Sequence, residues 1–214
     1  MGYHESLTEG RNAVLEAFRS GKTVDRLFVL DGCQDGPVKT ILREAKKQDT
    51  MVQYVKKERL DQLSETKNHQ GVIAYCAACE YAEVSDILEN AKKKGEAPFI
   101  VLLDGIEDPH NLGAIIRTAN QAGAHGVIIP KRRAVGLTAT VARTSAGAVN
   151  YTPVAKVTNL VTVMEDLKKE GMWFVCADMD GEEMYSLNLK GPIGLVIGNE
   201  GEGVSRLVKE HCDM

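Results

Sequence analysis

No run of about 20 apolar residues occurs in this sequence, and no charged-then-apolar leader opens it. The sequence therefore predicts neither a membrane span nor a secretory signal, and we expect a cytoplasmic protein. An excess of positive charge is missing as well, because 26 Lys and Arg residues stand against 30 Asp and Glu residues and leave a net charge of −4. Contact with a nucleic acid would therefore have to use local basic patches.

Cysteines are few and odd in number, which argues against a disulfide framework and for reduced thiols. The five are Cys33, Cys76, Cys79, Cys176 and Cys212. Cys76 and Cys79 form a lone C-x-x-C without a second Cys or His pair at a suitable spacing. We interpret them as buried or incidental thiols rather than as a zinc or redox site, and the sequence suggests no metal.

One polar stretch, residues 104–117, follows an apolar run at residues 99–103 that predicts a buried strand of a parallel sheet. Asn111 stands where a helix N-cap is expected, and the apolar spacing beyond it predicts a helix that presents Arg117 away from its buried face. A polar loop between a parallel strand and a helix is a common ligand site in α/β sheets. An ordinary turn with a solvated arginine is the alternative.

A second stretch has the same layout near the end of the chain. Residues 192–198 predict a buried strand, residues 199–203 a glycine-rich loop, and a helix is expected from Val204 onward. The glycines follow the order G-x-x-G-x-G rather than the dinucleotide fingerprint G-x-G-x-x-G, and no G-x-x-x-x-G-K-[ST] phosphate loop occurs. The loop can therefore approach a ligand closely, but it belongs to neither common nucleotide-binding motif.

The phrases D-G-I-E-D-P-H-N-L-G-A-I-I-R and L-V-I-G-N-E-G-E-G resemble motifs 1 and 2 of the SpoU (TrmH) family of RNA 2′-O-ribose methyltransferases. The resemblance implies an α/β fold with a SPOUT-type trefoil-knotted catalytic domain, S-adenosyl-L-methionine as the cofactor, and a homodimer. The family's third motif should follow about where the chain stops at Met214. The C-terminal segment of the knot is therefore expected to be truncated in this chain.

The resemblance also assigns roles to residues. Arg117 matches the motif 1 arginine and is interpreted as a clamp on the substrate phosphate, because a guanidinium with a pKa above about 12 is a poor base. Asn111 would hold the motif 1 loop or the substrate. Glu200 would handle a proton or anchor the site, and a helix-N-terminal acid is the equally weighted alternative. The predicted cofactor-binding residues are Thr144, Ser145, Gly147, Ile197, Gly198, Asn199 and Gly201.

Residues 1–80 alternate between predicted strands and helices and make a small α/β unit. Helices are predicted at 10–19, 38–47 and 58–63, and strands at 24–30, 52–55 and 72–76. The phrases at residues 10–14 and 68–72 resemble those of the family's L30e-like N-terminal domain, which implies RNA capture and makes Arg11 a candidate RNA contact. A structural appendage is the alternative. Residues 81–97 are interpreted as a linker and 98–214 as the methyltransferase domain.

A basic loop, Lys131-Arg132-Arg133, follows a predicted strand at residues 126–130. Its position on the same sheet edge as the two motif loops favours contact with the RNA backbone over a merely solvated loop. Residues 107–111 and 131–137 resemble the RlmB-type branch of the family in particular. This resemblance implies methylation of a guanosine in 23S ribosomal RNA. The alternatives are a tRNA ribose 2′-O-methyltransferase and a non-catalytic RNA-binding protein.

Overall fold

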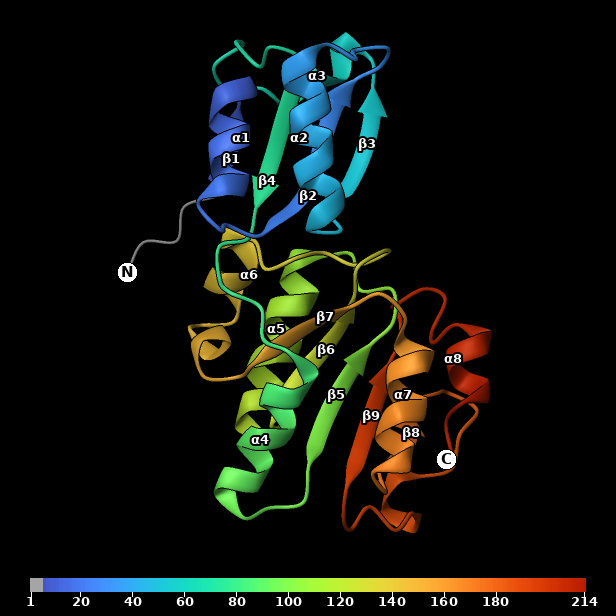
Figure 1. Ribbon diagram of the computed structural model, residues 1–214. Helices are drawn as coiled ribbons and strands as arrows, with labels where there is room; N and C mark the ends of the chain where they lie inside the picture. The colour runs from blue at the N-terminus through green and yellow to red at the C-terminus, as the bar shows by residue number, and fades with distance from the viewer. Residues whose placement is uncertain (1–5) are drawn as a thin grey trace. The chain divides into compact units, whose positions relative to one another are not determined.

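The computed structural model describes residues 6–214 (Figure 1). They divide into two compact units, one made of residues 6–80 with 136–139 and the other of residues 81–135 with 140–214. The short segment 136–139, placed in the methyltransferase domain by the sequence analysis, thus packs with the first unit, where the Ala78 N–H donates to the Leu137 carbonyl. Within residues 6–214, no helix combines the length and the apolar character needed to cross a membrane.

The first unit is a four-stranded sheet with three helices. In chain order its elements are β1 (Ser6–Glu9), α1 (Arg11–Arg19), β2 (Val24–Leu30), α2 (Gly36–Lys47), β3 (Met51–Val55), α3 (Lys57–Leu63) and β4 (Val72–Cys76). The strand order is β1-β4-β2-β3, in which only β2 and β3 are parallel. The strand β1 was not predicted, because it has only four residues and pairs with β4, more than sixty residues away.

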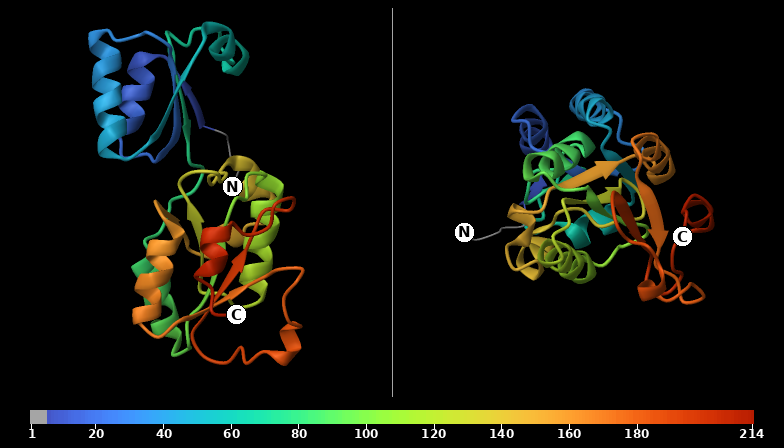
Figure 2. Two further views of the ribbon diagram at one scale, coloured as in Figure 1. Left: turned by 90° about the vertical axis from the view of Figure 1, so that its right-hand side faces the viewer. Right: turned by 90° about the horizontal axis from the view of Figure 1, so that it is seen from below.

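Alternate residues of the strands face opposite sides of this sheet. Val29 and Val72 belong to the core cluster that α1 and α2 complete, whereas Phe28 and Ile73 join Leu60 of α3 in a separate cluster. Figure 2 shows the same division, with α1 and α2 on one side of the sheet and α3 on the other. Both faces of the sheet are thereby covered.

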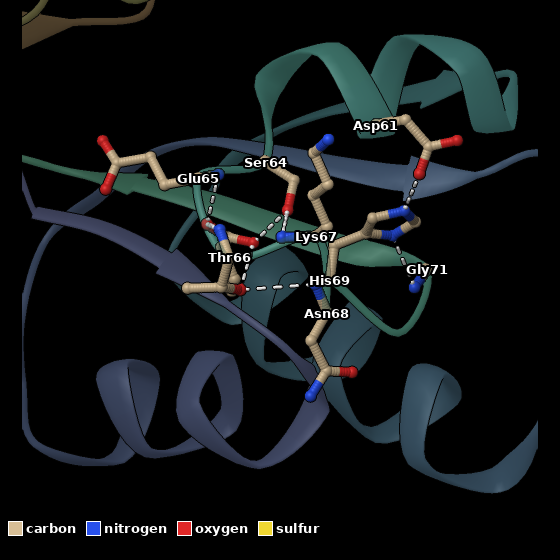
Figure 3. A network of polar contacts seen from close by, with 9 residues as sticks. Asp61, Ser64, Glu65, Thr66, Lys67, Asn68, His69 and Gly71 are labelled. Atoms are coloured by element: carbon tan, nitrogen blue, oxygen red, sulfur yellow. Dashed lines mark hydrogen bonds and ion pairs between the residues drawn. The ribbon is translucent and has the colours of Figure 1, made fainter.

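The loop that joins α3 to β4, residues 64–71, is held by Glu9 at the end of β1. The two Glu9 carboxylate oxygens accept hydrogen bonds from the Ser64 hydroxyl, from the backbone N–H groups of Glu65 (2.7 Å) and Thr66 (3.2 Å), and from the Thr66 hydroxyl (3.0 Å). The Ser64 hydroxyl in turn accepts from the Lys67 N–H at 2.8 Å (Figure 3). The carboxylate of the half-buried Glu9 therefore fixes the first half of the loop.

His69 holds the second half of the same loop (Figure 3). Its ring is buried, and its Nδ1 accepts a hydrogen bond from the Gly71 N–H at 3.0 Å. The hydrogen must then be on Nε2, which lies 3.0 Å from Asp61 Oδ1 and donates to it. Residues 69–71 thus form a turn that is held by the side chains of His69 and Asp61.

Replacement of Glu9 by glutamine tests this anchoring. Burial opposes ionisation of Glu9, but the hydrogen bonds from Ser64, Glu65 and Thr66 outweigh it and hold the pKa of Glu9 below its ordinary value. The ionised side chain therefore stabilises the fold above the ordinary pKa of a glutamate, and this contribution is lost as the pH falls through the lowered pKa. We expect Glu9→Gln to cost about 1–3 kcal/mol of unfolding free energy at pH 7.

Urea denaturation of the wild type and the variant at a series of pH values measures this effect. The difference in unfolding free energy should shrink as the pH falls below the glutamate range. Glu16→Gln, at an exposed position of α1, is the matched control and should leave stability nearly unchanged. A Glu9→Gln difference that is zero at pH 7, or constant down to low pH, would contradict the assigned role.

The second unit is a five-stranded parallel sheet covered by helices on both faces. Its elements are α4 (Val84–Lys94), β5 (Phe99–Leu103), α5 (Pro109–Gln121), β6 (Gly126–Pro130), α6 (Ala139–Thr144), η1 (Ala148–Asn150), β7 (Val154–Val157), α7 (Leu160–Lys169), β8 (Trp173–Cys176), η2 (Met184–Ser186), β9 (Ile193–Ile197) and α8 (Arg206–Glu210). The strand order is β7-β6-β5-β9-β8, and every pairing is parallel. The carboxyl ends of all five strands therefore meet at one edge.

The core of this unit follows the period of two along its strands. Ile100, Leu102 and Ile128 pack in one cluster with residues of α4 and α7, including Ile87 and Met164. Figure 2 shows α4 and α7 on this face of the sheet and α5 on the other. Residues 81–97, which the sequence analysis interprets as a linker, contain α4. The fully buried Ile87 of this helix belongs to the core of the second unit.

Candidate functional site

The two motif loops lie side by side because β5 and β9 are neighbours. Leu103 pairs with Ile197 at the carboxyl end of both strands, and the Asp104 N–H donates to the Ile197 carbonyl at 2.9 Å. The Asp104 side chain is buried, and its Oδ2 accepts from the Ser205 N–H at 2.8 Å. Two segments separated by about ninety residues of sequence are therefore tied together at the sheet edge, and sequence reasoning missed Asp104 as the tie.

Asn199 organises the glycine-rich loop with its side chain as well as its backbone. Its Nδ2 donates to the Gly105 carbonyl at 2.8 Å, and its Oδ1 accepts from the Gly201 N–H at 2.8 Å and the Glu202 N–H at 3.3 Å. Its backbone exchanges two hydrogen bonds with Gly203, at 2.9 and 2.8 Å. The side chain of Asn199, a predicted cofactor-binding residue, thus fixes the shape of the loop, and its contact with a cofactor stays a prediction.

Gly198 makes this tight loop possible. A Cβ at Gly198 would lie 2.0 Å from the backbone carbon of Gly203 and 2.1 Å from the Val204 nitrogen. These distances are too short for any residue other than glycine unless the backbone moves. The helix α8 starts only at Arg206. Glu200 therefore lies outside the first turn of a helix, and its interpretation as a helix-N-terminal acid is wrong.

The first turn of α5 faces the glycine-rich loop. Asp108 is the N-cap, since its Oδ1 accepts from the His110 N–H at 2.6 Å and the Asn111 N–H at 3.1 Å. The prediction of Asn111 as the N-cap was therefore wrong, and its side chain is available for another contact. The Asn111 Nδ2 donates to Glu200 Oε2 at 3.4 Å, which brings together two of the three predicted catalytic residues. Both side chains are exposed.

The same end of α5 also contacts the third predicted loop. A Cβ at Gly113 would lie 1.9 Å from Thr144 Oγ1 and 2.9 Å from the Ser145 nitrogen, so the absence of a side chain lets α5 and the end of α6 touch. The Thr144 hydroxyl donates to the Thr140 carbonyl at 2.9 Å. Ser145 is fully buried, and its hydroxyl donates to the Ala142 carbonyl at 3.0 Å. A ligand at this loop would therefore meet its backbone rather than the Ser145 hydroxyl.

Arg117 lies one turn beyond Gly113 on the same side of α5. This side faces the segment after α6, because Asn120 Nδ2, a further turn along, donates to Thr152 Oγ1 at 2.9 Å. Arg117 is exposed, and its guanidinium makes no hydrogen bond or ion pair with any residue from 6 to 214. Helical side chains lean toward the N-terminus of their helix, so the long Arg117 side chain extends toward the start of α5.

The predicted basic loop is anchored at one end to β7 and at the other end to the motif 1 loop. The Lys131 N–H donates to the Val157 carbonyl at 2.8 Å, and the Val135 N–H donates to the Ile106 carbonyl at 2.9 Å. Arg132 and Arg133 are exposed between these anchors. Two unburied cations therefore lie at the sheet edge that carries the site.

Arg11, the predicted RNA contact of the first unit, is engaged within that unit. Its guanidinium pairs with Asp35 at 2.5 Å, and its Nε donates to the Gln70 carbonyl at 3.1 Å. Its backbone N–H donates to Gln70 Oε1 at 3.2 Å. Arg11 therefore holds the end of the loop 64–71, and its contact with RNA stays a prediction.

The thiols and the potential metal ligands take no part in this site. Burial raises the pKa of Cys79 and of Cys176, and burial together with the neighbouring Cys176 raises the pKa of Cys212 to about 12. Protonated thiols of this kind are poor nucleophiles. In the described part of the chain, no three His, Cys, Asp or Glu side chains gather as a metal site would require.

Comparison with protein families matches both units. Residues 98–214 match the SpoU rRNA methylase family, and residues 7–82 match the RNA 2′-O ribose methyltransferase substrate-binding family. A Bacillus subtilis protein assigned to the TrmH family of tRNA/rRNA methyltransferases is 48% identical over 206 residues, which cover 95% of this chain and 82% of the relative. A Staphylococcus haemolyticus protein of the same assignment is 45% identical over 205 residues, with the same coverage of both chains.

Solved structures share the fold. The SpoU methyltransferase AviRb of Streptomyces viridochromogenes, in complex with AdoMet, superposes with a TM-score of 0.56 at 24% identity and covers 98% of this chain and 78% of its own. An AdoMet-bound rRNA methyltransferase of Sinorhizobium meliloti gives a TM-score of 0.54 at 24% identity, covering 96% and 75%. The predicted α/β fold of this type is thereby confirmed, and the trefoil knot stays a prediction. The chain belongs to the SpoU rRNA methylase family.

Proposed function

We propose that this chain transfers a methyl group from S-adenosyl-L-methionine to the ribose 2′-hydroxyl of a guanosine in 23S ribosomal RNA. The observation that carries the proposal is the contact of Asn111 with Glu200 at 3.4 Å, where the first turn of α5 meets the glycine-rich loop. Arg117 lies six residues beyond Asn111, roughly 9 Å along the helix axis. A carboxylate and an amide thereby meet at one edge of the parallel sheet, and farther along the same helix lies a guanidinium without a polar partner among residues 6–214.

The residues around this edge fit the cofactor. The backbone of residues 197–201 and of residues 144–147 would hold it, since Gly198 lets the first loop turn tightly, Gly201 and Gly147 present no side chain, and around Gly147 there is open space. Exposed peptide groups can hydrogen-bond an adenine edge, and the Glu200 carboxylate can accept from hydroxyl or ammonium groups. When bound, S-adenosyl-L-methionine supplies an already activated methyl group on a sulfonium, so no metal is required.

Arg117 would act on the RNA. A guanidinium binds phosphate through two parallel hydrogen bonds, and it also stabilises negative charge that develops on a nearby oxygen. Because Arg117 has no partner among residues 6–214, it is free to clamp a phosphate next to the reacting ribose. The clamp would align the 2′-oxygen for in-line attack on the methyl carbon.

Glu200 would deal with the proton of the 2′-hydroxyl. As the oxygen–carbon bond forms and the sulfur–carbon bond breaks, this proton must leave the ribose oxygen, and a carboxylate is an acceptor for it. The Asn111 amide, which donates to Glu200, would fix the orientation of the carboxylate. Arg132 and Arg133 on the neighbouring loop would contact further phosphates.

Calorimetric titration with S-adenosylhomocysteine tests the cofactor site. We expect binding near one site per chain, because the two loops that would hold the cofactor are already joined through α5. Absence of binding would overturn the enzyme proposal and favour an RNA-binding protein without methyltransferase activity. The proposed homodimer would be read from the molecular mass of the same sample in solution.

Methyl incorporation identifies the substrate. The chain would be incubated with radiolabelled S-adenosyl-L-methionine and either 23S ribosomal RNA or tRNA. Label in ribosomal RNA, at a ribose of guanosine after nuclease digestion, would support the proposal. Label in tRNA alone would replace it by the tRNA ribose 2′-O-methyltransferase.

A further inference from the structure

An open pocket of about 490 Å³ lies in the first unit, between the start of α1 and the loop 64–71. Its size is within the range of about 300–1,000 Å³ that is usual for small-ligand pockets. The polar side chains that line it are mostly neutral, namely those of Asn12, Thr66, Asn68 and Gln70, and Glu9 is the one charged residue among the described lining residues. Most of these residues belong to the phrases at 10–14 and 68–72, whose resemblance implies RNA capture, but that resemblance names no feature of the RNA that the pocket would bind.

The pocket is suited to a neutral polar ligand rather than to a phosphate. No lysine or arginine is among its described lining residues. Figure 3 shows Lys67 and Asn68 leaving the loop in opposite directions, so the exposed cation lies away from the side on which Asn68 points. Both oxygens of the single carboxylate, Glu9, are occupied by hydrogen bonds from the loop.

Carboxamides dominate the polar surface that remains. The side chains of Asn12 and Asn68 are exposed and make no hydrogen bond with any residue that the structure describes. Gln70 Oε1 accepts from the Arg11 N–H, which leaves the Gln70 amide nitrogen as a donor. A carboxamide offers a donor and an acceptor in one plane, the pattern that pairs with the edges of nucleobases.

The loop that carries Asn68 and Gln70 is organised before any ligand arrives. Glu9 and His69 brace it, Arg11 fixes its end, and Gln70 keeps a left-handed backbone with φ of 50°. Because the loop is already ordered, a ligand would not have to offset the entropy of ordering it. A pocket that is ordered in advance and lined by carboxamides is suited to binding a ligand through specific hydrogen bonds.

We propose that this pocket receives one unpaired nucleobase of the RNA substrate and reads its edge through the side chains of Asn12 and Asn68. The proposal rests on the proposed function, since it takes RNA as the substrate, and it goes further by naming the recognised feature and the residues. Sequence-specific proteins generally read unpaired bases in RNA loops and bulges, because the edges of paired bases are hidden in the A-form helix. None of the described lining residues is aromatic, so hydrogen bonds rather than stacking carry the recognition.

Fluorescence anisotropy with two labelled RNAs tests the proposal. One RNA is a hairpin with an unpaired loop of mixed sequence, and the other is a fully paired duplex of the same length. We expect the wild-type chain to prefer the hairpin, and the Asn12→Ala/Asn68→Ala double variant to bind the hairpin about tenfold more weakly or worse, with duplex binding unchanged. Gln53→Ala removes an exposed carboxamide from β3 at the far edge of the same sheet and should behave as the wild type.

The outcomes separate this proposal from the proposed function. Equal hairpin affinities of the wild type and the double variant would overturn the pocket, even if the chain methylates RNA. A wild-type chain without preference for the hairpin would overturn it too. Hairpin binding that depends on Asn12 and Asn68, in a chain that transfers no methyl group, would support the pocket and overturn the methyltransferase.

Discussion

Replacement of Arg117 by alanine should lower methyl transfer to RNA at least about 100-fold, the usual cost of removing one charge-stabilising group from an active site. The guanidinium is exposed and makes no hydrogen bond or ion pair with any of residues 6–214, so the substitution removes a group that is free to meet the substrate and breaks no polar interaction of the described fold. Cofactor affinity and unfolding free energy should therefore stay close to the wild-type values. Single-turnover methyl incorporation, S-adenosylhomocysteine titration and urea denaturation measure the three quantities.

Two further substitutions define what the Arg117 result means. Arg117→Lys keeps the charge but loses the planar fork, and it should retain only part of the activity. Arg43→Ala, an exposed arginine of α2 in the first unit, is the matched control and should transfer methyl at the wild-type rate. Full activity of Arg117→Ala would remove the arginine from the mechanism. A large fall in its stability would make the role structural instead.

Replacement of Gly198 by alanine should open the glycine-rich loop. The added Cβ would lie 2.0–2.3 Å from backbone atoms of Gly203 and Val204, and backbone cannot move aside as the end of a flexible side chain can. We expect a loss of about 1–3 kcal/mol in unfolding free energy, the usual cost of overpacking. The shifted loop would also carry Glu200 away from Asn111, so S-adenosylhomocysteine should bind about tenfold more weakly or worse.

Gly201→Ala is the matched control for this effect on stability. Its Cβ would meet only Asn199 Oδ1, at the ordinary contact distance of 3.5 Å, and the position does not require a left-handed backbone. Urea denaturation should therefore place Gly201→Ala near the wild type and Gly198→Ala well below it. Equal stabilities of the two variants would show that the loop is loose in solution and would contradict its tight geometry.

Much of the fold could be read from local patterns. The strands predicted at residues 99–103 and 126–130 are β5 and β6 with those bounds, and the apolar residues of α7 (Leu160–Lys169) recur at helical spacing. Gly95, which follows the last residue of α4, has the left-handed φ of 69° that a helix C-terminus favours. Each of these features depends on residues within a few positions of one another.

The predictions from sequence were wrong mainly at the first residues of helices and strands, where contacts with distant parts of the chain decide the boundary. Asp108 and Asn111 are both good N-cap residues, and the path of the chain out of β5 decided for Asp108. The strand β7 begins only at Val154, because the 3-10 helix η1 and the turn after it occupy the residues before. The helix expected from Val204 begins at Arg206, since Asp104 holds the Ser205 N–H.

The family and its two motif loops followed from the order of residue types along the chain, because those loops need glycines, acids and an arginine at set spacings. The arrangement of the site did not follow from that order. It depends on β9 lying beside β5, on the Asp104 and Asn199 side chains that tie the two loops, and on the contact of Gly113 with Thr144. Strand neighbours and cross-chain contacts join residues tens of positions apart, and their free energy comes from burial and hydrogen bonds that exist only once the sheet is assembled.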